Sequence, residues 1–209
     1  MKVTIIGAGN MGRGIGTRLV AGGNEVQIID RDPAEAQALA AELGDAATAS
    51  SPGDEITGEV VVLAVYYGSV EDAVEQYREQ LAGKVVVDIT NPVDLATFDG
   101  LATAAGTSAA EEIAGLLPEG TAVVKAFNTT FAGTLAAGEA GGQQLDVLIA
   151  GDDEEAKGKV AALAEAGGLR PIDVGPLRRA QQLEQLGFLH MSVQEALGAG
   201  FGSAVKLHW

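Results

Sequence analysis

Residues 3–12 read Val3-Thr4-Ile5-Ile6-Gly7-Ala8-Gly9-Asn10-Met11-Gly12, and this stretch decides the fold. The apolar run from Val3 to Ile6 is typical of a short buried strand. Apolar residues at helical spacing follow from Met11 to Val20, and Gly22-Gly23 ends that pattern. The glycines at positions 7, 9 and 12 therefore lie in a turn that joins a buried strand directly to a helix.

The G-x-G-x-x-G spacing in this turn indicates a dinucleotide-binding site. Gly7 permits the tight turn, Gly9 lets the backbone approach a pyrophosphate, and Gly12 lets the helix pack close to the strand. The free amides at the start of the helix attract the anion. We therefore expect the pyrophosphate of a nicotinamide dinucleotide to lie on Gly7, Ala8, Gly9, Asn10, Met11 and Gly12.

A position about twenty residues further on distinguishes NAD from NADP. Asp30 ends a second strand-like run, where a carboxylate accepts hydrogen bonds from both hydroxyls of the adenosine ribose. Arg31 could instead lie over the adenine or pair with the 2′-phosphate of NADP. Because Asp32 and Glu35 add negative charge nearby, the sequence slightly favours NAD and leaves NADP as the alternative.

Strand-like and helical patterns alternate along the rest of the chain. Apolar runs recur at residues 25–30, 59–65, 84–89, 121–126, 145–150 and 169–174. Helical patterns lie at residues 33–43, 70–81, 108–117 and 154–166, and from 176 to about 197 with a break near Ser192. Continuous aliphatic strands separated by helices are typical of a parallel sheet covered on both faces. We predict a doubly wound α/β fold of Rossmann type, with a mainly parallel sheet, helices on both faces and a helical C-terminal segment.

The domain organisation follows from the absence of a long linker. We expect a single Rossmann-like domain over residues 1–209. Within it, residues 1–150 carry the cofactor site, and residues 151–209 form a strand–helix extension toward the second substrate or a dimer partner.

The composition excludes several classes of function. A formal net charge of −16 argues against nucleic acid and anionic membrane surfaces as partners, and so favours a small-molecule substrate. The absence of cysteine excludes thiolate zinc sites and cysteine nucleophiles, and we expect no metal site. Met1-Lys2 leads straight into the first strand, and no apolar run is long enough to span a membrane. We therefore expect a cytoplasmic protein.

Other strand ends supply further candidate residues, because ligands of a doubly wound sheet lie beyond the carboxyl ends of its strands. Residues 64–66 would flank a ribose, and the two asparagine-containing loops after the next strands would approach the nicotinamide. Asn128 could bond the carboxamide, although each asparagine could equally cap a turn. The expected site is lined by Ala64, Val65, Tyr66, Asn91, Pro92, Asn128 and Thr129.

Segments along nearly the whole chain resemble the deazaflavin-dependent NADP oxidoreductases, the family that moves a hydride between NADP(H) and coenzyme F420. They are IIGAGNMG at 5–12, VVDITNPVD at 86–94, VVKAFNTTFAG at 123–133, IAGDDEEAK at 149–157 and GLRPIDVGPLRRAQQLEQL at 168–186. The later segments are the more specific, since many unrelated enzymes share the glycine turn. Family members that use NADP usually have a small residue where this chain has Asp30.

The resemblance implies roles for several regions. It implies that residues 8–11 hold the pyrophosphate and that Asp30 and Arg31 face the adenosine ribose. It implies that the loops after Val65, Ile89 and Ala126, with the C-terminal segment, enclose the nicotinamide and the deazaflavin. It also implies a homodimer, or a higher assembly, built partly through the C-terminal helices.

Hydride transfer between two stacked rings depends mainly on positioning and needs little acid–base help. The chain has only two histidines, and His190 is the candidate proton donor, with a partly buried helix histidine as the alternative. We predict an oxidoreductase that transfers a hydride between NAD(P)H and F420. One alternative is a reductase of a small carbonyl or imine, for which His190, Tyr66 or Tyr67 would supply the proton. Another is a non-catalytic dinucleotide-binding protein.

Overall fold

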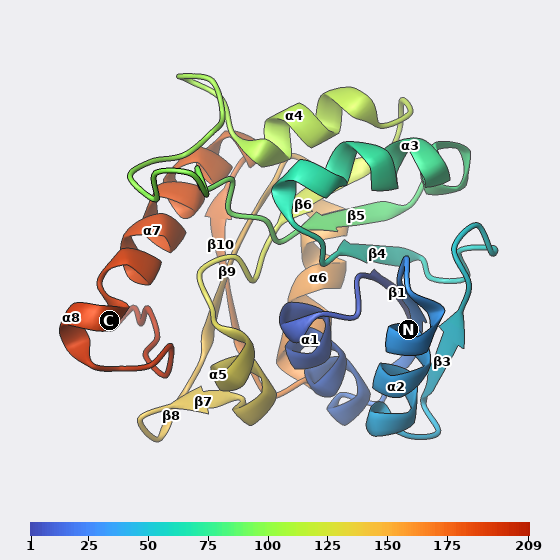
Figure 1. Cartoon of the computed structure of the whole chain (residues 1–209), viewed down its shortest axis with the longest axis horizontal. Helices are drawn as coiled ribbons and strands as arrows, with labels where there is room; N and C mark the ends of the chain where they lie inside the picture. The colour runs from blue at the N-terminus through green and yellow to red at the C-terminus, as the bar shows by residue number, and fades with distance from the viewer.

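One eight-stranded sheet runs through the molecule, and helices pack on both of its faces (Figure 1). This computed structural model describes residues 1–209. In their order across the sheet, the strands are β10 (Arg170–Gly175), β9 (Asp146–Gly151), β6 (Ala122–Lys125), β5 (Val85–Asp88), β4 (Val60–Leu63), β1 (Lys2–Ile6), β2 (Glu25–Ile29) and β3 (Ala47–Ser50). The predicted α/β fold with a mainly parallel sheet is confirmed.

Two groups of helices enclose the sheet. One face carries α1 (Asn10–Ala21), α2 (Pro33–Leu43), α5 (Ala132–Ala137) and α6 (Glu154–Ala166). The other carries α3 (Val70–Leu81), α4 (Ala109–Leu116) and α7 (Ala180–Ser192). Aliphatic side chains of both groups pack against the Val- and Ile-rich strands, which explains why these strands are apolar along their whole length. This packing fixes the strand ends that position the site.

The direction of the last two strands differs from that of the others. Strands β1 to β6 run parallel, whereas β9 pairs antiparallel with β6, and β10 runs parallel to β9. The connection from β6 to β9, residues 126–145, stays at the carboxyl edge of the sheet. It forms α5, of six residues, passes through the hairpin of β7 (Glu139–Ala140) and β8 (Gln143–Gln144), and enters β9 from that edge.

Three elements are absent from the sequence prediction: β3, α5 and the small hairpin. Strand β3 reads Ala-Thr-Ala-Ser and pairs only with β2, at the edge of the sheet. An edge strand that is only partly buried needs no aliphatic side chains, so it gives little hydrophobic signal. Short 3₁₀ turns, η1 (Tyr67–Ser69) and η2 (Leu177–Arg179), precede α3 and α7, and α8 (Gln194–Leu197) ends the helical part of the chain.

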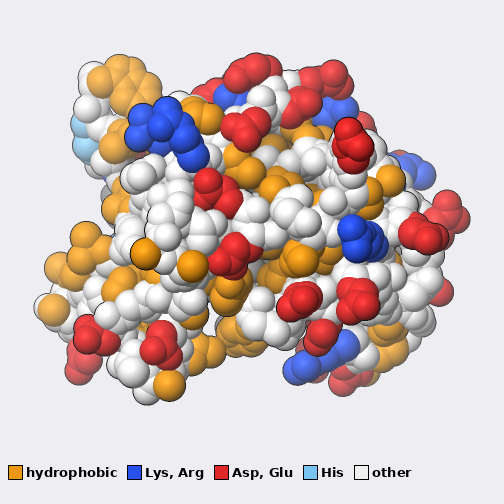
Figure 2. All heavy atoms as spheres, turned by 90° about the horizontal axis from the view of Figure 1, so that it is seen from above, with side chains coloured by type: hydrophobic (Ala, Val, Ile, Leu, Met, Phe, Trp, Pro, Cys, Tyr) orange, Lys and Arg blue, Asp and Glu red, His pale blue; other side chains and the backbone are white.

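The acidic charge is spread over the surface. Figure 2 shows acidic side chains distributed across the face that carries α3 and α4, with fewer basic side chains between them. On this face the acidic side chains do not gather into a single patch. No helix combines the length and the apolar character needed to cross a bilayer.

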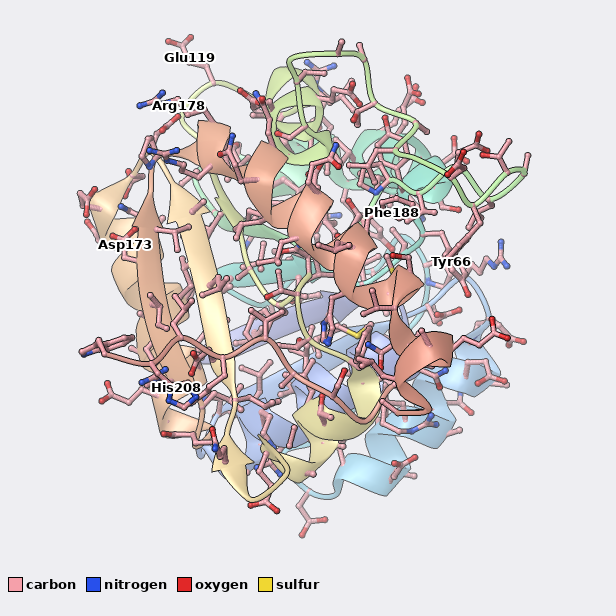
Figure 3. The ribbon with its side chains drawn as sticks, turned by 90° about the vertical axis from the view of Figure 1, so that its left-hand side faces the viewer. Tyr66, Glu119, Asp173, Arg178, Phe188 and His208 are labelled. Atoms are coloured by element: carbon pink, nitrogen blue, oxygen red, sulfur yellow. The ribbon has the colours of Figure 1, made fainter.

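The C-terminal tail, residues 198–209, folds back to β9 and β10 (Figure 3). Asp146, at the start of β9, accepts two hydrogen bonds of 2.7 Å from Arg170 and one of 2.6 Å from Lys206. It also accepts the amide of Leu207 at 2.8 Å, while the Arg170 guanidinium lies 4.4 Å from the centre of the Trp209 ring. A single buried carboxylate therefore holds the end of the chain.

This arrangement predicts a release of the tail in acid. Burial alone would raise the pKa of Asp146, but the hydrogen bonds from Arg170, Leu207 and Lys206 outweigh it and lower the pKa from 3.8 to about 2. Because the folded-state pKa is depressed, the stabilisation is present above pH 4 and is lost as the pH falls through about 2. It is worth about 2 kcal/mol.

We expect the emission of Trp209, the only tryptophan, to change over this pH range while far-ultraviolet circular dichroism reports whether the core stays folded. Asp146→Asn should show the released signal already at neutral pH and a lower melting temperature. The control Asp99→Asn, in an exposed loop, should behave as wild type. Wild-type emission in Asp146→Asn at neutral pH would contradict the assignment of Asp146.

Candidate active site

The turn after β1 can be built only from glycine at two of its positions. Gly7 has φ of +114°, and a Cβ there would lie 2.3 Å from the carbonyl oxygen of Ala64. A Cβ on Gly12 would lie 2.1 Å from the carbonyl oxygen of Gly7. Both obstacles are backbone atoms, which cannot move aside cheaply. The predicted roles of Gly7 in the turn and of Gly12 in helix packing thus have a direct steric basis.

Gly9 differs from these two glycines because no atom lies within 4 Å of the position its Cβ would take. It caps α1 without any side-chain hydrogen bond, so the first amides of the helix, from Asn10 and Met11, have no partner inside the helix. Gly9 and Asn10 are exposed. The turn therefore presents free N–H groups and the positive end of α1 to open space, which suits an anion.

Asp30 lies at the end of β2 and is tied to this turn. Its carboxylate accepts the amide of Ala8 at 2.7 Å and the amide of Asp32 at 2.9 Å. The neighbouring acid has a structural role as well, since Asp32 caps α2 by accepting the amide of Ala34 at 2.9 Å. Arg31, between them, is exposed and forms no salt bridge. The Asp30 carboxylate, which the sequence assigns to the ribose, thus already accepts two backbone amides.

The predicted site residues meet at one edge of the sheet. The carboxyl ends of β1, β2, β4, β5 and β6 lie side by side because these strands are parallel neighbours. Tyr66 is 82% exposed, and Figure 3 shows it at the surface beyond α7. The structure brings to this edge Gly7 to Gly12, Asp30, Arg31, Ala64, Val65, Tyr66, Asn91, Pro92, Asn128 and Thr129.

Two asparagines from adjacent loops form a pair. The Asn91 amide donates to the carbonyl oxygen of Asn128 at 2.8 Å. The Asn128 amide donates to Asn91 Oδ1 at 2.9 Å and to the carbonyl oxygen of Leu183, on α7, at 2.9 Å. Asn128 is 4% exposed, and its Oδ1 is buried and accepts no hydrogen bond. An unpaired buried acceptor costs about 1–3 kcal/mol, so a donor that gained access to this oxygen would be stabilised.

Phe127 gives the second asparagine loop a strained backbone. It is 4% exposed and has φ of +63°, in the left-handed region that favours glycine. Its carbonyl oxygen accepts both the amide and the hydroxyl of Thr130. Such strain persists where surrounding contacts determine the backbone, and it is common at binding sites. It marks this loop as a candidate for ligand contact.

A buried charged cluster lies directly beneath the asparagine pair. Lys125, at the end of β6, is 0% exposed and donates to Asp88 at 2.7 Å, to the carbonyl oxygen of Thr90 at 2.6 Å and to Glu184 at 2.8 Å. Burial raises the pKa of Glu184 although Lys125 opposes that shift. Sequence reasoning missed this cluster. The sequence feature that could have revealed the cluster is the presence of Lys125 and Asp88 in strands that are otherwise apolar.

Two candidate proton donors have unsuitable protonation properties. Tyr67 donates a short hydrogen bond to Glu112, and burial, together with that carboxylate, raises the pKa of Tyr67 to about 12. His190 is 8% exposed, its ring lies 4.3 Å from that of Phe131, and its Nε2 is 2.8 Å from the hydroxyl of Ser203. Burial lowers the pKa of His190, so the imidazole is neutral at pH 7. The catalytic role of His190 stays a prediction.

No group of three or more His, Asp or Glu side chains is arranged to hold a metal ion.

The chain is similar to several known proteins. Residues 2–92 match the family described as NADP oxidoreductase coenzyme F420-dependent. The F420-dependent NADP reductase of Methanothermobacter marburgensis is 34% identical over 209 aligned positions, which cover 89% of each protein. The solved structure of a candidate F420-dependent NADP reductase from Arthrobacter sp. FB24 has a TM-score of 0.87 and 30% identity, and covers 100% of both chains.

A further relative is longer than this chain. The rat metalloreductase STEAP3 is 34% identical over 185 residues, which cover 88% of this chain but 36% of the metalloreductase. The chain thus spans about a third of the length of that relative, whereas it spans nearly the whole of the two reductases.

Proposed function

This chain belongs to the family of coenzyme F420-dependent NADP oxidoreductases, and on that premise we propose that it transfers a hydride between NADP(H) and coenzyme F420. The observation that carries the proposal is the meeting, at one sheet edge, of a free-amide turn after β1 with the unpaired oxygen of Asn128. The first group suits a pyrophosphate, and the second suits the N–H of a nicotinamide carboxamide.

The proposed reaction balances without a protein-derived group. The nicotinamide of NADPH gives a hydride to the deazaflavin ring, and one proton from solvent completes the reduced coenzyme and leaves NADP⁺. The chain's own contribution is to bind and orient. Residues 8–11 hold the pyrophosphate, and Asn128 orients the carboxamide. The rest of the dinucleotide site is lined by Ala64, Val65, Tyr66, Asn91, Pro92 and Thr129. Residues 1–150 then carry the cofactor, and residues 151–209 extend toward the deazaflavin.

Hydride transfer between rings is favoured over reduction of a carbonyl or imine by the state of two of the three candidate acids. Such a reduction needs a group that releases a proton near neutral pH. Tyr67, with a pKa raised to about 12, and His190, with a lowered pKa, do not fit that need. A reaction limited by positioning requires neither of them.

We propose NADP(H) as the preferred dinucleotide, with Arg31 as the partner of the 2′-phosphate. The support is that Asp30 and Asp32 bind backbone amides, whereas Arg31 is exposed and forms no salt bridge. We expect Arg31→Ala to raise KM for NADPH roughly 10- to 100-fold, which is the range for a lost charge-assisted bond, and to leave KM for NADH nearly unchanged. Steady-state kinetics with both cofactors measures this.

The matched control for that prediction is Arg78→Ala, since Arg78 is also an exposed arginine without a salt bridge but lies on α3. It should leave both KM values unchanged. An equal effect of Arg31→Ala on NADPH and NADH would contradict the phosphate role. Wild-type protein that prefers NADH would instead support the ribose role that the sequence analysis assigns to Asp30.

We also propose a homodimer that uses the C-terminal helices. Apolar side chains are exposed there, including Leu189 at 58%, Leu197 at 63% and Phe201 at 54%. Sedimentation equilibrium at micromolar concentration should give twice the chain mass, and a stable single-chain mass would overturn the proposal.

We propose the cytoplasm as the compartment, since NADPH is a coenzyme of the cell interior, and cell fractionation tests it.

The assay that tests the function mixes the protein with oxidised F420 and either NADPH or NADH. We expect bleaching of the deazaflavin at the same molar rate as NADPH oxidation. Tight NADPH binding without consumption would indicate a non-catalytic dinucleotide-binding protein.

A further inference from the structure

We propose that Glu184, on helix α7, is a positioning residue that fixes the Asn91–Asn128 pair in the geometry that hydride transfer needs. This inference rests on the proposed function and deepens it. Glu184 itself touches neither asparagine. It acts by fastening α7 to the ends of β5 and β6, so that one face of the helix forms the support for the pair.

The same face of α7 contacts both asparagines. Leu183 accepts the Asn128 amide through its carbonyl oxygen at 2.9 Å. Gly187, one helical turn further on, lies so close that a Cβ there would be 2.5 Å from Asn91 Oδ1 and 3.0 Å from the carbonyl oxygen of Asn128. Glu184 precedes Gly187 by three residues, so these two residues share one side of the helix. A shift of α7 would therefore move the support of both amides.

The attachment of Glu184 is short and buried. The residue is 0% exposed, and Lys125 donates to it at 2.8 Å. Its carboxylate also accepts the amide of Ala109 at 3.1 Å, at the start of α4. Lys125 donates in turn to the carbonyl oxygen of Thr90, the residue immediately before Asn91. Two hydrogen bonds thus connect α7 to the backbone that carries the first asparagine.

The neutralisation of Lys125 alone does not explain this carboxylate. Asp88 already neutralises Lys125, so Glu184 adds a second acid to a site that is fully buried. A buried ion pair is often no more stable than packed apolar side chains of similar size, and its better attested use is to specify one arrangement. A methionine or leucine would fill the space, but only an acceptor directed at Lys125 and α4 fixes the position of α7.

Gly187→Ala tests the support without weakening the helix. Alanine is favoured over glycine within a helix by about 1 kcal/mol, so the variant should fold. Its methyl group would displace the Asn91 side chain, and we expect kcat with NADPH and F420 to fall roughly 10- to 100-fold, as for other small misplacements. Gly158→Ala in α6 is the matched control, since no atom lies within 4 Å of its Cβ position. It should keep wild-type kcat.

Glu184→Ala tests the attachment, and Glu184→Gln provides an intermediate variant that keeps one of the two acceptor oxygens. The alanine variant removes the acceptor for Lys125 and Ala109, so its kcat should fall within the same range. Lys125 and Ala109 donate to different oxygens of Glu184, and glutamine keeps only one acceptor oxygen. The glutamine variant should therefore recover part of the activity, with kcat between that of the alanine variant and that of wild type. All rates are expressed per site that binds NADP⁺, so that loss of folded protein does not lower them.

Two further readouts separate positioning from a structural role. The primary deuterium isotope effect on kcat should rise in Gly187→Ala and Glu184→Ala, because the chemical step becomes slower relative to release. Titration calorimetry should show weaker binding of NADP⁺ but unchanged binding of its adenosine half, 2′,5′-ADP.

Wild-type kcat per site and isotope effect in both variants would overturn this inference while leaving the proposed function intact. Wild-type protein that never reduces F420 would overturn the proposed function. The calorimetry would then still test the support of the pair.

Discussion

Gly12→Ala should raise the dissociation constant for NADPH roughly 100-fold or more, since each 1.4 kcal/mol of lost binding is a factor of ten. The alanine methyl would lie 2.1 Å from the carbonyl oxygen of Gly7, which is backbone and closes the turn. To make room, α1 must move away from β1, and its free amides then no longer converge on the pyrophosphate. Fluorescence titration of NADPH measures the loss.

Gly9→Ala provides the comparison for this variant. Its methyl would meet no protein atom within 4 Å, so the melting temperature should stay close to that of wild type. The methyl would nevertheless occupy the space that we assign to the pyrophosphate, and NADPH binding should weaken. Unchanged NADPH binding in both variants would show that the dinucleotide binds elsewhere.

Asn128→Ala should lower kcat/KM for NADPH by about 100-fold. The change removes the unpaired Oδ1 that we assign to the carboxamide and two hydrogen bonds, to Asn91 and to Leu183. Each such bond is worth about 0.5–1.5 kcal/mol, and the buried partners left behind add to the loss. The Asn91 side chain then keeps only its hydrogen bond to the backbone carbonyl oxygen of residue 128. Steady-state kinetics with saturating F420 measures the effect.

The control is Asn24→Ala, which also removes a buried asparagine. Asn24 is 5% exposed and bonds to the N-terminus and to the carbonyl oxygen of Leu19, away from the carboxyl edge of the sheet. It should lower the melting temperature but leave kcat/KM nearly unchanged. Equal kinetic effects of the two substitutions would indicate that Asn128 contributes only to folding.

The glycine turn could be predicted because its requirements are local. Gly7 and Gly12 are five residues apart, and the steric reasons for both lie within one strand–helix connection and the neighbouring strand end. The asparagines could be predicted as neighbours because strand ends in a parallel sheet share an edge. That their amides bond to each other follows from loop conformation, which strand periodicity does not describe.

Contacts between distant segments escaped sequence reasoning. Lys125 and Glu184 are 59 residues apart, and Glu184 occurs in a helical segment that contains several other polar residues. The carboxylate of Asp30 could accept hydrogen bonds from a ribose or from the amide of Ala8, which lies 22 residues earlier in the chain. The residue type alone does not distinguish these two partners. The reversed direction of β9 follows a connection that contains α5, whose small, glycine-containing sequence gives a weak helical pattern.

The most direct test of the account is the fate of the hydride itself. NADPH carrying deuterium at both C4 positions is incubated with the protein and oxidised F420 in ordinary water, and the reduced F420 is analysed by mass spectrometry. The account predicts that each reduced F420 gains one deuterium from NADPH, because the two rings exchange a hydride directly. Reduced F420 without deuterium, or no reduction of F420 while NADPH is bound, would contradict it.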